Sequence, residues 1–496
     1  MIGGGPAGVS AALQGAELGA QVTLVERKRV GGTSVNEGPA PVRTLARAAR
    51  LVRDARSWET FGLRGSAPEV DVKAAVANAV RVADYSHDVK RMSEYIASCG
   101  VELVQGVGQC WFVDPHTIET PDGQRYSGDA IIIAVGGHAG RLPIPGAELA
   151  LTYEDIRSLD ELPVSTVVIG GSDTGCQLAS ILVDFGSQVT VLEYAERIKP
   201  RSDHDVSDAL AAAFTAKGMR IVTGTQATEI ERSGEVFLVH HLVDGVRQTV
   251  AADLVFFAVG WPGNADTLRP EAIGLQTARG YVTVDDRLVS SVPHILAAGD
   301  ATGLSMLVPS ARQQGLVAAE NAVLGTRRRN THEIVPTGSF TDPEYGSVGL
   351  TEQEARARYD CEVAIVRYDD LLRPVVDARS GGFCKLIVEP TGATSWARTC
   401  SASTRPRSSR WWPPVWPPTC ASSSWPICSS PSLRSPRRWA WPRRSACVNW
   451  VSPAWPSSGA SCGRRRPTPT PQRSGPTPGR DLFAMYRSAR CRRMTQ

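Results

Sequence analysis

A glycine-rich turn between a strand and a helix occurs twice in this chain, and it restricts the fold more than any other feature. The first copy has Gly3, Gly5 and Gly8 in the spacing G-x-G-x-x-G. The first glycine permits a tight turn, the second lets the backbone approach a diphosphate, and the third lets the helix pack closely on the strand. A helix-like run over 9–18 follows, and the next strand-like run ends in Glu26, an acid placed to bind a ribose. The pattern predicts a dinucleotide-binding βαβ unit in preference to a plain turn.

The second copy of the turn has Gly170, Ser172 and Gly175 in the same spacing. Serine at the second position is small enough to leave the close approach open. The strand that follows ends in Glu193, and a carboxylate there favours a free ribose 2′-hydroxyl over a 2′-phosphate. We therefore expect NADH in preference to NADPH, although Arg197 nearby keeps NADPH as an alternative. The other alternative is a Rossmann-like unit that binds nothing.

The first strand of the first unit is predicted to be incomplete. Only Met1 and Ile2 precede the first glycine, whereas a central parallel strand usually has about five residues. We therefore expect that the assigned start of the chain lies downstream of the true one.

The segment over residues 31–43 reads G-G-T-S-V-N-E-G-P-A-P-V-R. It resembles the redox-active segment of the pyridine nucleotide-disulphide oxidoreductases, which reads G-G-T-C-x-N-x-G-C-x-P-S-K. Gly32 and Thr33 keep the frame that lines the FAD site of that family, but Ser34 and Pro39 occupy the positions of the two cysteines. A serine hydroxyl is a poor nucleophile without a base, and a proline side chain has no nucleophile. The resemblance therefore implies a flavoenzyme scaffold that cannot form the family's dithiol.

Three further apolar runs resemble strands of the same family. Gly136 follows a run that resembles the strand beside the adenosine end of the flavin, and Gly260 follows one that resembles the strand returning from the NAD domain. Trp261, the next residue, stands where the family usually has arginine. Asp300 ends a run whose aspartate, in the family, binds a ribityl hydroxyl of FAD, and a helix N-cap is the alternative role. A helix expected over 311–323 should then point its N-terminus at the flavin.

Two expected neighbours of the flavin differ from the family as a pair. The family usually has lysine and glutamate, joined as an ion pair, where this chain has Arg43 and Gln177. Arginine can still hydrogen-bond a neutral amide, through a planar fork unlike the lysine ammonium, so we expect the nicotinamide site to persist. The family's acid–base histidine belongs to a C-terminal segment of the partner subunit. This chain has no histidine after His332, so that role is unfilled.

The C-terminal part differs in composition from the rest of the chain. Nine of the twelve tryptophans lie at or beyond Trp396, and Asp and Glu are absent between Glu389 and Asp481. The runs of Arg, Pro and Trp show neither helical nor strand periodicity. Reading their codons one step out of register gives segments that resemble the interface helix of the family. We therefore expect 393–496 to be an out-of-frame, disordered tail, with a genuine extension as the alternative, and its arginines do not indicate nucleic acid.

Composition and charge exclude several other classes. The chain has 496 residues, of which 42% are hydrophobic, so it can bury large cores in several domains, and its formal net charge is only +4. It has no run of about 18 apolar residues, so no membrane span is expected. The eleven cysteines show neither a paired framework nor metal-ligand spacing. With no visible signal peptide, we expect a cytoplasmic protein without a metal.

These features predict an α/β protein with two Rossmann-like nucleotide-binding domains, for FAD and NAD(P), a truncated α+β interface domain and an irregular tail. Residues 340–352 resemble the opening of the family's interface domain. The expected order along the chain is an FAD domain split in two, an inserted NAD(P) domain, the partial dimerisation domain and the tail: 1–145, 146–264, 265–330, 331–392 and 393–496.

The resemblance implies an FAD-dependent oxidoreductase of NAD(P)H, with NADH favoured. Without a dithiol, electrons must pass from the flavin directly to a small acceptor such as a quinone, a dye or oxygen, which is a diaphorase-type activity. The alternatives are dihydrolipoamide or mercuric reduction, and a relic that is not catalytic or does not fold. The homodimer typical of the family is expected to be destabilised, because half of the interface domain would be missing.

Overall fold

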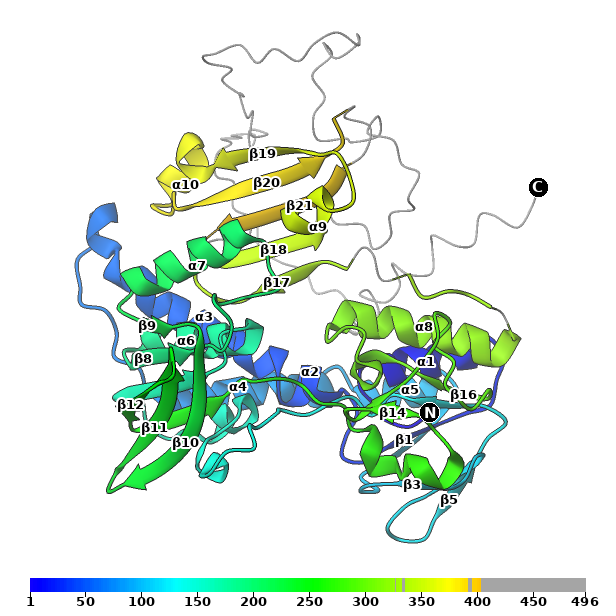
Figure 1. The fold of residues 1–496 in the computed structure, drawn as a ribbon. Coiled ribbons are helices and arrows are strands. Elements are labelled where there is room, and N and C mark those ends of the chain that lie inside the picture. The colour runs from blue at the N-terminus through cyan, green and yellow to red at the C-terminus, as the bar shows by residue number, and fades with distance from the viewer. Residues whose placement is uncertain (326, 332–334, 391–394, 403–496) are drawn as a thin grey trace, which may run out of the picture. The chain divides into compact units, whose positions relative to one another are not determined.

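The computed structural model describes residues 1–325, 327–331 and 335–390, and the backbone alone of 395–402 (Figure 1). These residues fall within a single structural unit of the chain, Met1–Ser422. Most of the predicted tail lies outside the described residues. A search of the described helices finds none that is long and apolar enough to cross a membrane.

A parallel sheet carries the first glycine-rich turn. Ile2 forms parallel bridges to both Val25 and Ile133, and so it is the single-residue middle strand of this sheet. The sheet order is β16 (Ile295–Ala297), β6 (Ile131–Ile133), Ile2, β1 (Val22–Glu26) and β2 (Val101–Gln105). Every residue of β6 and β16 is buried, as expected for parallel strands covered on both faces.

Two helices that are far apart in the sequence pack against each other beside this sheet. They are α1 (Pro6–Glu17) and α8 (Val308–Leu324), which Figure 1 shows side by side. A Cβ on Gly315 of α8 would lie only 2.3 Å from the carbonyl oxygen of Ala7, so the two backbones touch. The other elements before residue 130 are α2 (Gly32–Asn36), α3 (Pro39–Arg56), α4 (Val72–Asp88), α5 (Met92–Ser98), and a small sheet of β3 (Trp111–Asp114), β4 (Thr117–Glu119) and β5 (Arg125–Ser127).

A second parallel sheet carries the second glycine-rich turn. Its order is β13 (Leu254–Phe257), β7 (Ser165–Ile169), β8 (Gln188–Leu192) and β9 (Arg220–Val222). Val167, Val168 and Phe256 have no exposed surface, which explains why these strands read as continuous apolar runs. Helix α6 (Asp173–Phe185) follows β7 along the chain, and α7 (His204–Ala216) follows β8. An antiparallel sheet of β10 (Thr225–Ser233), β11 (Val236–Val243) and β12 (Val246–Ala252) precedes β13.

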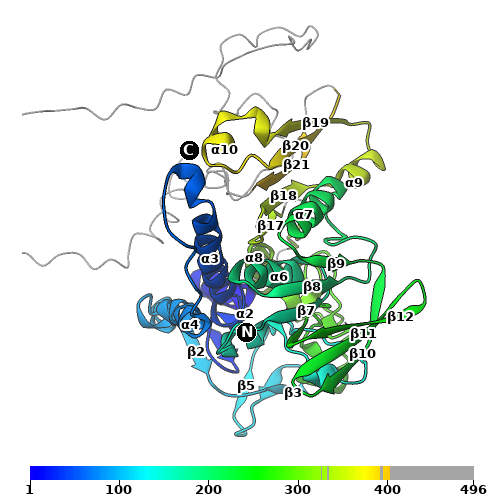
Figure 2. The same ribbon diagram turned by 90° about the vertical axis from the view of Figure 1, so that its left-hand side faces the viewer.

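The C-terminal part of the described chain is an antiparallel sheet (Figure 2). Its order is β17 (Thr337–Ser339), β18 (Glu344–Gly349), β21 (Ser395–Ala402), β20 (Gly382–Val388) and β19 (Glu362–Arg367), with short helices α9 (Glu352–Arg356) and α10 (Leu372–Val376). The strand β21 pairs with β18 on one side and with β20 on the other. It lies beyond residue 392, the predicted end of the interface domain, so this sheet includes backbone that was predicted to belong to the tail.

A network of charges joins α3, α6, the C-terminal end of α7 and the loop before β18. Arg53 contacts Asp184 at 3.1 Å and Asp342 at 3.0 Å, while Lys217 contacts the same two carboxylates at 3.2 and 2.6 Å. Burial raises the pKa of Asp184, which is 2% exposed, and the two cations oppose that shift. Four stretches of the chain are thereby held together by two cations and two anions.

Helices α1 and α8 begin earlier than the apolar pattern predicts. The first was expected over 9–18 and begins at Pro6, and the helix expected over 311–323 begins at Val308. Both have proline in the first two positions, where its fixed φ favours a helix and its missing N–H costs nothing. The helix of the second turn begins at Asp173, and an acid suits this first position because of the helix dipole.

The packing of the second turn predicts a strict size limit at Gly175. A Cβ there would lie 1.8 Å from the carbonyl oxygen of Gly170, so Gly175→Ala must force helix α6 away from β7. We expect a loss of about 1–3 kcal/mol in the free energy of unfolding, measured by thermal unfolding. The matched control is Gly381→Ala, because the space around Gly381 is open and its φ is not positive. Equal stability of the two variants would contradict the prediction.

Candidate functional site

The first cradle, defined as residues 3–26, has the geometry of a diphosphate-binding turn. Gly3 has a φ of +99°, and a Cβ on it would lie 2.4 Å from Ala134 O. A Cβ on Gly8 would lie 1.8 Å from Gly3 O, which fixes the helix against the strand. Around Gly5 the nearest atom to such a Cβ is 3.9 Å away, so this position is open. No side chain caps the N-terminus of helix α1, so the backbone N–H groups of its first turn have no capping partner.

The second cradle, defined as residues 170–193, repeats this construction. Gly170 has a φ of +106°, and a Cβ on it would again lie 2.4 Å from a carbonyl oxygen, here that of Ala258. Ser172 is exposed and is the N-cap residue of α6, but its side chain forms no cap hydrogen bond. The serine therefore leaves the turn accessible. The two cradles are built in the same way, and each would present the N-terminus of a helix to an anionic ligand.

The acid at the end of each cradle is fixed by the turn itself. Glu26 Oε2 accepts the N–H of Gly4 at 2.6 Å, and Glu193 Oε2 accepts that of Gly171 at 2.5 Å. The other oxygen of each carboxylate accepts a backbone N–H from two residues further on, at 2.8 Å in both cases. Since each carboxylate offers about four lone-pair sites, both acids keep acceptor capacity for a ribose.

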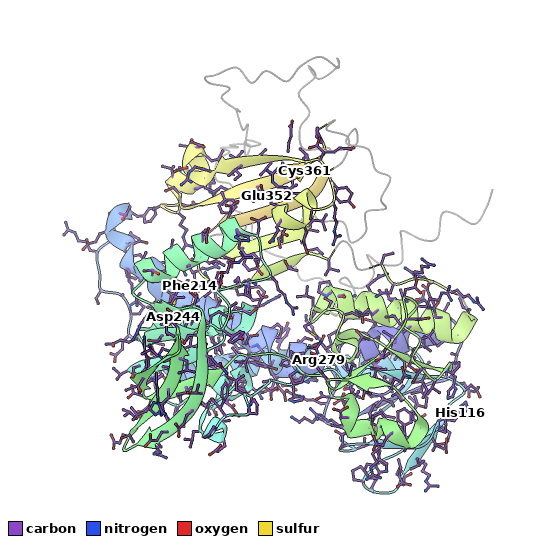
Figure 3. The ribbon with its side chains drawn as sticks, viewed as in Figure 1. His116, Phe214, Asp244, Arg279, Glu352 and Cys361 are labelled. Atoms are coloured by element: carbon purple, nitrogen blue, oxygen red, sulfur yellow. The ribbon has the colours of Figure 1, made fainter. Side chains whose placement is uncertain are left out.

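One large cavity connects the two cradles. Its volume is about 2300 Å³, which exceeds the roughly 300–1,000 Å³ typical of a pocket for a single small ligand. The cavity wall includes all of the predicted site residues except the two packing glycines, Gly8 and Gly175. Arg279, from the turn between β14 (Thr277–Ala278) and β15 (Tyr281–Val282), also lines it (Figure 3). The residues that reach it are Gly3, Gly5, Glu26, Gly32, Thr33, Ser34, Pro39, Arg43, Gly136, Gly170, Ser172, Gln177, Glu193, Gly260 and Asp300.

The positions of the family's two cysteines lie on this wall without thiols. Ser34 is in α2 and donates its hydroxyl to Gly31 O at 3.1 Å, and Pro39 is the first residue of α3. Among the residues whose side chains the structure describes, no cysteine forms a disulfide bond. Cys110 and Cys384 line the cavity, and burial raises the pKa of the Cys110 thiol to about 11. That thiol is therefore protonated at neutral pH.

The close approach of the two glycine segments explains why their frame persists. A Cβ on Gly32 would lie 2.7 Å from the Cα of Gly5, so the turn of the first cradle and the segment 31–43 touch through backbone alone. Gly31, at a φ of +108°, and Gly32, at +54°, also adopt left-handed conformations that favour glycine.

Arg43 and Gln177 reach the cavity from different helices, α3 and α6. The guanidinium carbon of Arg43 lies 4.0 Å from the ring centroid of Phe340, a cation–π contact. Gln177 is half-buried on the first turns of α6. The structure thus brings the pair to the same cavity, and it adds Phe340 as a neighbour that the sequence pattern did not indicate.

Asp300 has an unexpected partner in Trp261, the residue that stands where the family usually has arginine. The indole N–H of Trp261 donates to Asp300 Oδ2 at 2.9 Å, and the hydroxyl of Tyr281 donates to the carbonyl oxygen of Trp261. Burial raises the pKa of the Asp300 carboxyl to about 6, and the hydrogen bond from Trp261 partly opposes this shift. The sequence marked Trp261 only as a departure, because a hydrogen bond between residues 39 positions apart has no local signature.

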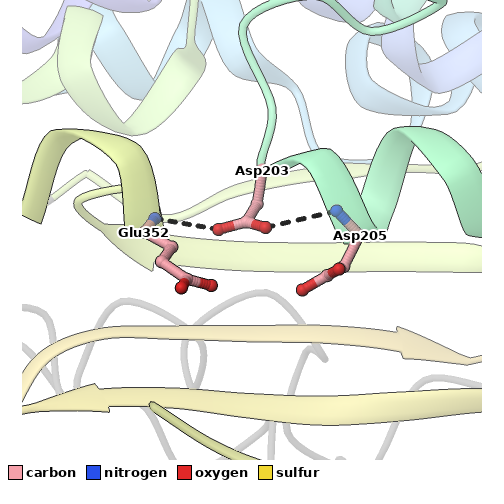
Figure 4. Close-up of side chains that lie close together, drawn as sticks. All are labelled: Asp203, Asp205 and Glu352. Atoms are coloured by element: carbon pink, nitrogen blue, oxygen red, sulfur yellow. Dashed lines mark hydrogen bonds between the residues drawn. The ribbon is translucent and has the colours of Figure 1, made fainter. Parts of the chain in front are cut away.

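Three carboxylates, of which Asp203 alone lines the cavity, meet in a way that could suit a divalent cation (Figure 4). Asp203, Asp205 and Glu352 have oxygens within 4.8 Å of one another. The ammonium of Lys385, which is 1% exposed, takes the place of a cation and contacts them at 2.8, 2.6 and 2.5 Å. Burial by itself lowers the pKa of Lys385, but the hydrogen bonds to the three carboxylates outweigh it and raise the pKa. This cluster is a structural ion pair network that joins α7, α9 and β20.

Comparison with known proteins identifies the family. Residues 1–315 match the family described as pyridine nucleotide-disulphide oxidoreductase, and residues 335–394 match its dimerisation domain. The chain belongs to the pyridine nucleotide-disulphide oxidoreductase family. The family and the fold class predicted from the glycine turns and from residues 31–43 are therefore confirmed.

Individual relatives cover most of the chain. It is 30% identical to the mercuric reductase of Lysinibacillus sphaericus over 393 residues, which are 78% of this chain and 71% of that protein. It is 32% identical to the dihydrolipoyl dehydrogenase of Thermus scotoductus over 399 residues, 78% of this chain and 84% of that protein. Its structure is similar to that of LpdA from Mycobacterium tuberculosis, with a TM-score of 0.73, 25% identity and coverage of 81% and 89% of the two chains.

The raised pKa of Asp300 predicts that ionisation of this carboxyl lowers the free energy of unfolding of the flavin-free chain. A carboxyl whose folded pKa is about 6, against about 3.9 when unfolded, binds its proton more tightly in the fold. The ionised form therefore destabilises the fold above pH 6, and stability is gained as the pH falls through 6. Asp300→Asn should raise the free energy of unfolding by about 1–2 kcal/mol near pH 8 and by almost nothing below pH 4. The first value allows for solvent screening of the Asp300 carboxylate, which is partly exposed.

The measurement is denaturant unfolding of the flavin-free chain across this pH range. Asp208→Asn, on an exposed position of α7, is the control for the loss of a negative charge. A difference between wild type and Asp300→Asn that does not change with pH would contradict the assignment.

Proposed function

We propose that this chain is an FAD-dependent oxidoreductase that oxidises NADH and passes the electrons directly to a small acceptor. The observation that carries the proposal is the cavity between the two cradles, whose wall has Ser34 and Pro39 at the positions of the family's cysteines. A cavity with two dinucleotide-type cradles and no thiol pair at those positions supports electron transfer between two ligands, and it supports no transfer into a dithiol.

The first cradle fits FAD. Its open position at Gly5, the uncapped N-terminus of α1 and the fixed carboxylate of Glu26 suit the diphosphate and the adenosine ribose. Asp300 would accept a hydrogen bond from a ribityl hydroxyl, with Trp261 orienting its carboxylate. When bound, FAD supplies the redox chemistry, by accepting a hydride from a reduced nicotinamide and releasing two electrons to an acceptor.

The second cradle fits the nicotinamide dinucleotide. The N-terminus of α6 would face the diphosphate, and Glu193 would accept hydrogen bonds from the ribose diol. A carboxylate in this place repels a 2′-phosphate, which supports NADH over NADPH as the substrate. Arg43 and Gln177, on the cavity wall between the cradles, would supply hydrogen-bond donors around the reacting rings.

The state of the other thiols also supports direct transfer. Cys176, in the second cradle, donates its S–H to Gly171 O at 3.1 Å, and burial raises its pKa to about 12. A protonated, hydrogen-bonded thiol is a poor nucleophile. The match of residues 335–394 to the dimerisation domain supports a homodimer as the assembly.

The proposal predicts a sharp preference among acceptors. The purified chain should carry a yellow flavin, oxidise NADH with a water-soluble quinone, and show no turnover with lipoamide or oxidised glutathione, because Ser34 and Pro39 stand where the family's thiol pair would receive the electrons. The measurement is NADH absorbance loss with each acceptor at equal concentration. A Cys110→Ser/Cys384→Ser double variant is the control for the remaining cavity thiols and should retain quinone activity.

Two results would decide against the proposal. Robust turnover of a disulphide, or of a mercuric salt, would assign the activity carried by the names of the relatives. A colourless product that binds no added FAD would show that the chain is not a flavoenzyme.

A further inference from the structure

We propose that Lys199 is a diphosphate-binding side chain of the second cradle, with Asp173 and Tyr345 holding its ammonium at the N-terminus of α6. This inference rests on the proposed function, because it assumes that the second cradle accepts a dinucleotide. It assigns the charge that attracts that ligand, and glycine spacing alone does not predict it.

The backbone of Lys199 is fixed to the glycine-rich turn in an unfavourable conformation. Its N–H donates to Gly171 O at 2.8 Å, and its φ is +52°. Positive φ is uncommon for a residue with a side chain, and the proline at position 200 would normally favour an extended conformation for the residue before it. Such strain persists only where the surroundings impose it, and it is typical of ligand-binding segments.

The side chain of Lys199 is buried and is directed to the first residue of α6. Lys199 is 3% exposed, and its ammonium donates to Asp173 Oδ1 and to the hydroxyl of Tyr345, which itself donates to Asp173 at 3.0 Å. The ammonium also lies 4.4 Å from the centroid of the Tyr345 ring. All three residues line the cavity. An ammonium has three N–H donors, and the described residues use two of them.

The charge of Asp173 explains why a lysine is needed here. The first turn of α1, in the first cradle, has no acidic residue, whereas α6 begins with Asp173. A carboxylate at this position uses the positive end of the helix dipole and would repel an incoming diphosphate. The ammonium of Lys199 cancels that charge, and its remaining donor restores an attraction for the anion.

The test measures binding, and not turnover. ADP-ribose contains the diphosphate and the adenosine of NADH without a nicotinamide, and adenosine lacks the diphosphate. Both probes are titrated into the full-length chain by calorimetry at low and high salt. The variants are Lys199→Met, Asp173→Asn and Tyr345→Phe, and Lys217→Met is the control because Lys217 has a comparable ion pair network away from the cavity.

Lys199→Met should weaken ADP-ribose by about 10- to 100-fold, as expected for the loss of a charge-assisted contact, and should leave adenosine unchanged. It should also reduce the dependence of ADP-ribose binding on salt. Asp173→Asn, which keeps the ammonium, should tighten ADP-ribose, and Lys217→Met should behave like wild type. Tyr345→Phe should weaken ADP-ribose less than Lys199→Met does, because the charge remains.

Several results would overturn the inference. Unchanged ADP-ribose affinity in Lys199→Met would show that the ammonium only neutralises Asp173, and an equal loss for adenosine would show general disruption of the cradle. If Lys199→Met does not fold, weaker ADP-ribose binding in Asp173→Asn would still refute the inference. A chain that binds ADP-ribose but does not oxidise NADH would refute the proposed function alone, whereas a wild type that does not bind ADP-ribose would refute both.

Discussion

Both cradles depend on one steric contact, the approach of the third glycine of each turn to the carbonyl oxygen of the first. A Cβ on Gly8 or Gly175 would lie only 1.8 Å from that carbonyl oxygen, so no other residue allows the helix to come as close to the strand. That approach directs the N-termini of α1 and α6 to the cavity, because each helix starts directly at its turn. The acids are fixed to the same turns, because Glu26 and Glu193 accept backbone N–H groups of the turn residues.

The parts of the site that the sequence predicted are those with a local pattern. The glycine spacing, the acid about 20 residues further on, and the frame of residues 31–43 can each be read within a short window. Of the predicted site residues, all but the two packing glycines reach the cavity. The family was identified from the same windows. The strand β21, beyond residue 392, was not predicted, because it is placed by its pairing with β18 and β20 and has no apolar alternation of its own.

Long-range contacts account for what the sequence could not indicate. Trp261 and Asp300 are 39 residues apart, and Lys199 and Tyr345 are 146 apart. Lys385 reaches Asp203 across 182 residues. In each case the partner is supplied by another sheet or loop, so neither residue type nor spacing reveals the contact. The strained φ of Lys199 is likewise set by the glycine turn, and a lysine before a proline would be expected to be extended.

The contact between Gly5 and Gly32 separates the architecture of this protein from its chemistry. At Gly32 any added carbon meets the backbone of a neighbouring turn, so a side chain there would push the two segments apart. At Ser34 and Pro39 side chains of different size and polarity are accommodated on the cavity wall. The side chains at positions 34 and 39 can therefore be exchanged without disturbing the backbone contact that joins the two segments, so the fold tolerates changes there that it does not tolerate at Gly32.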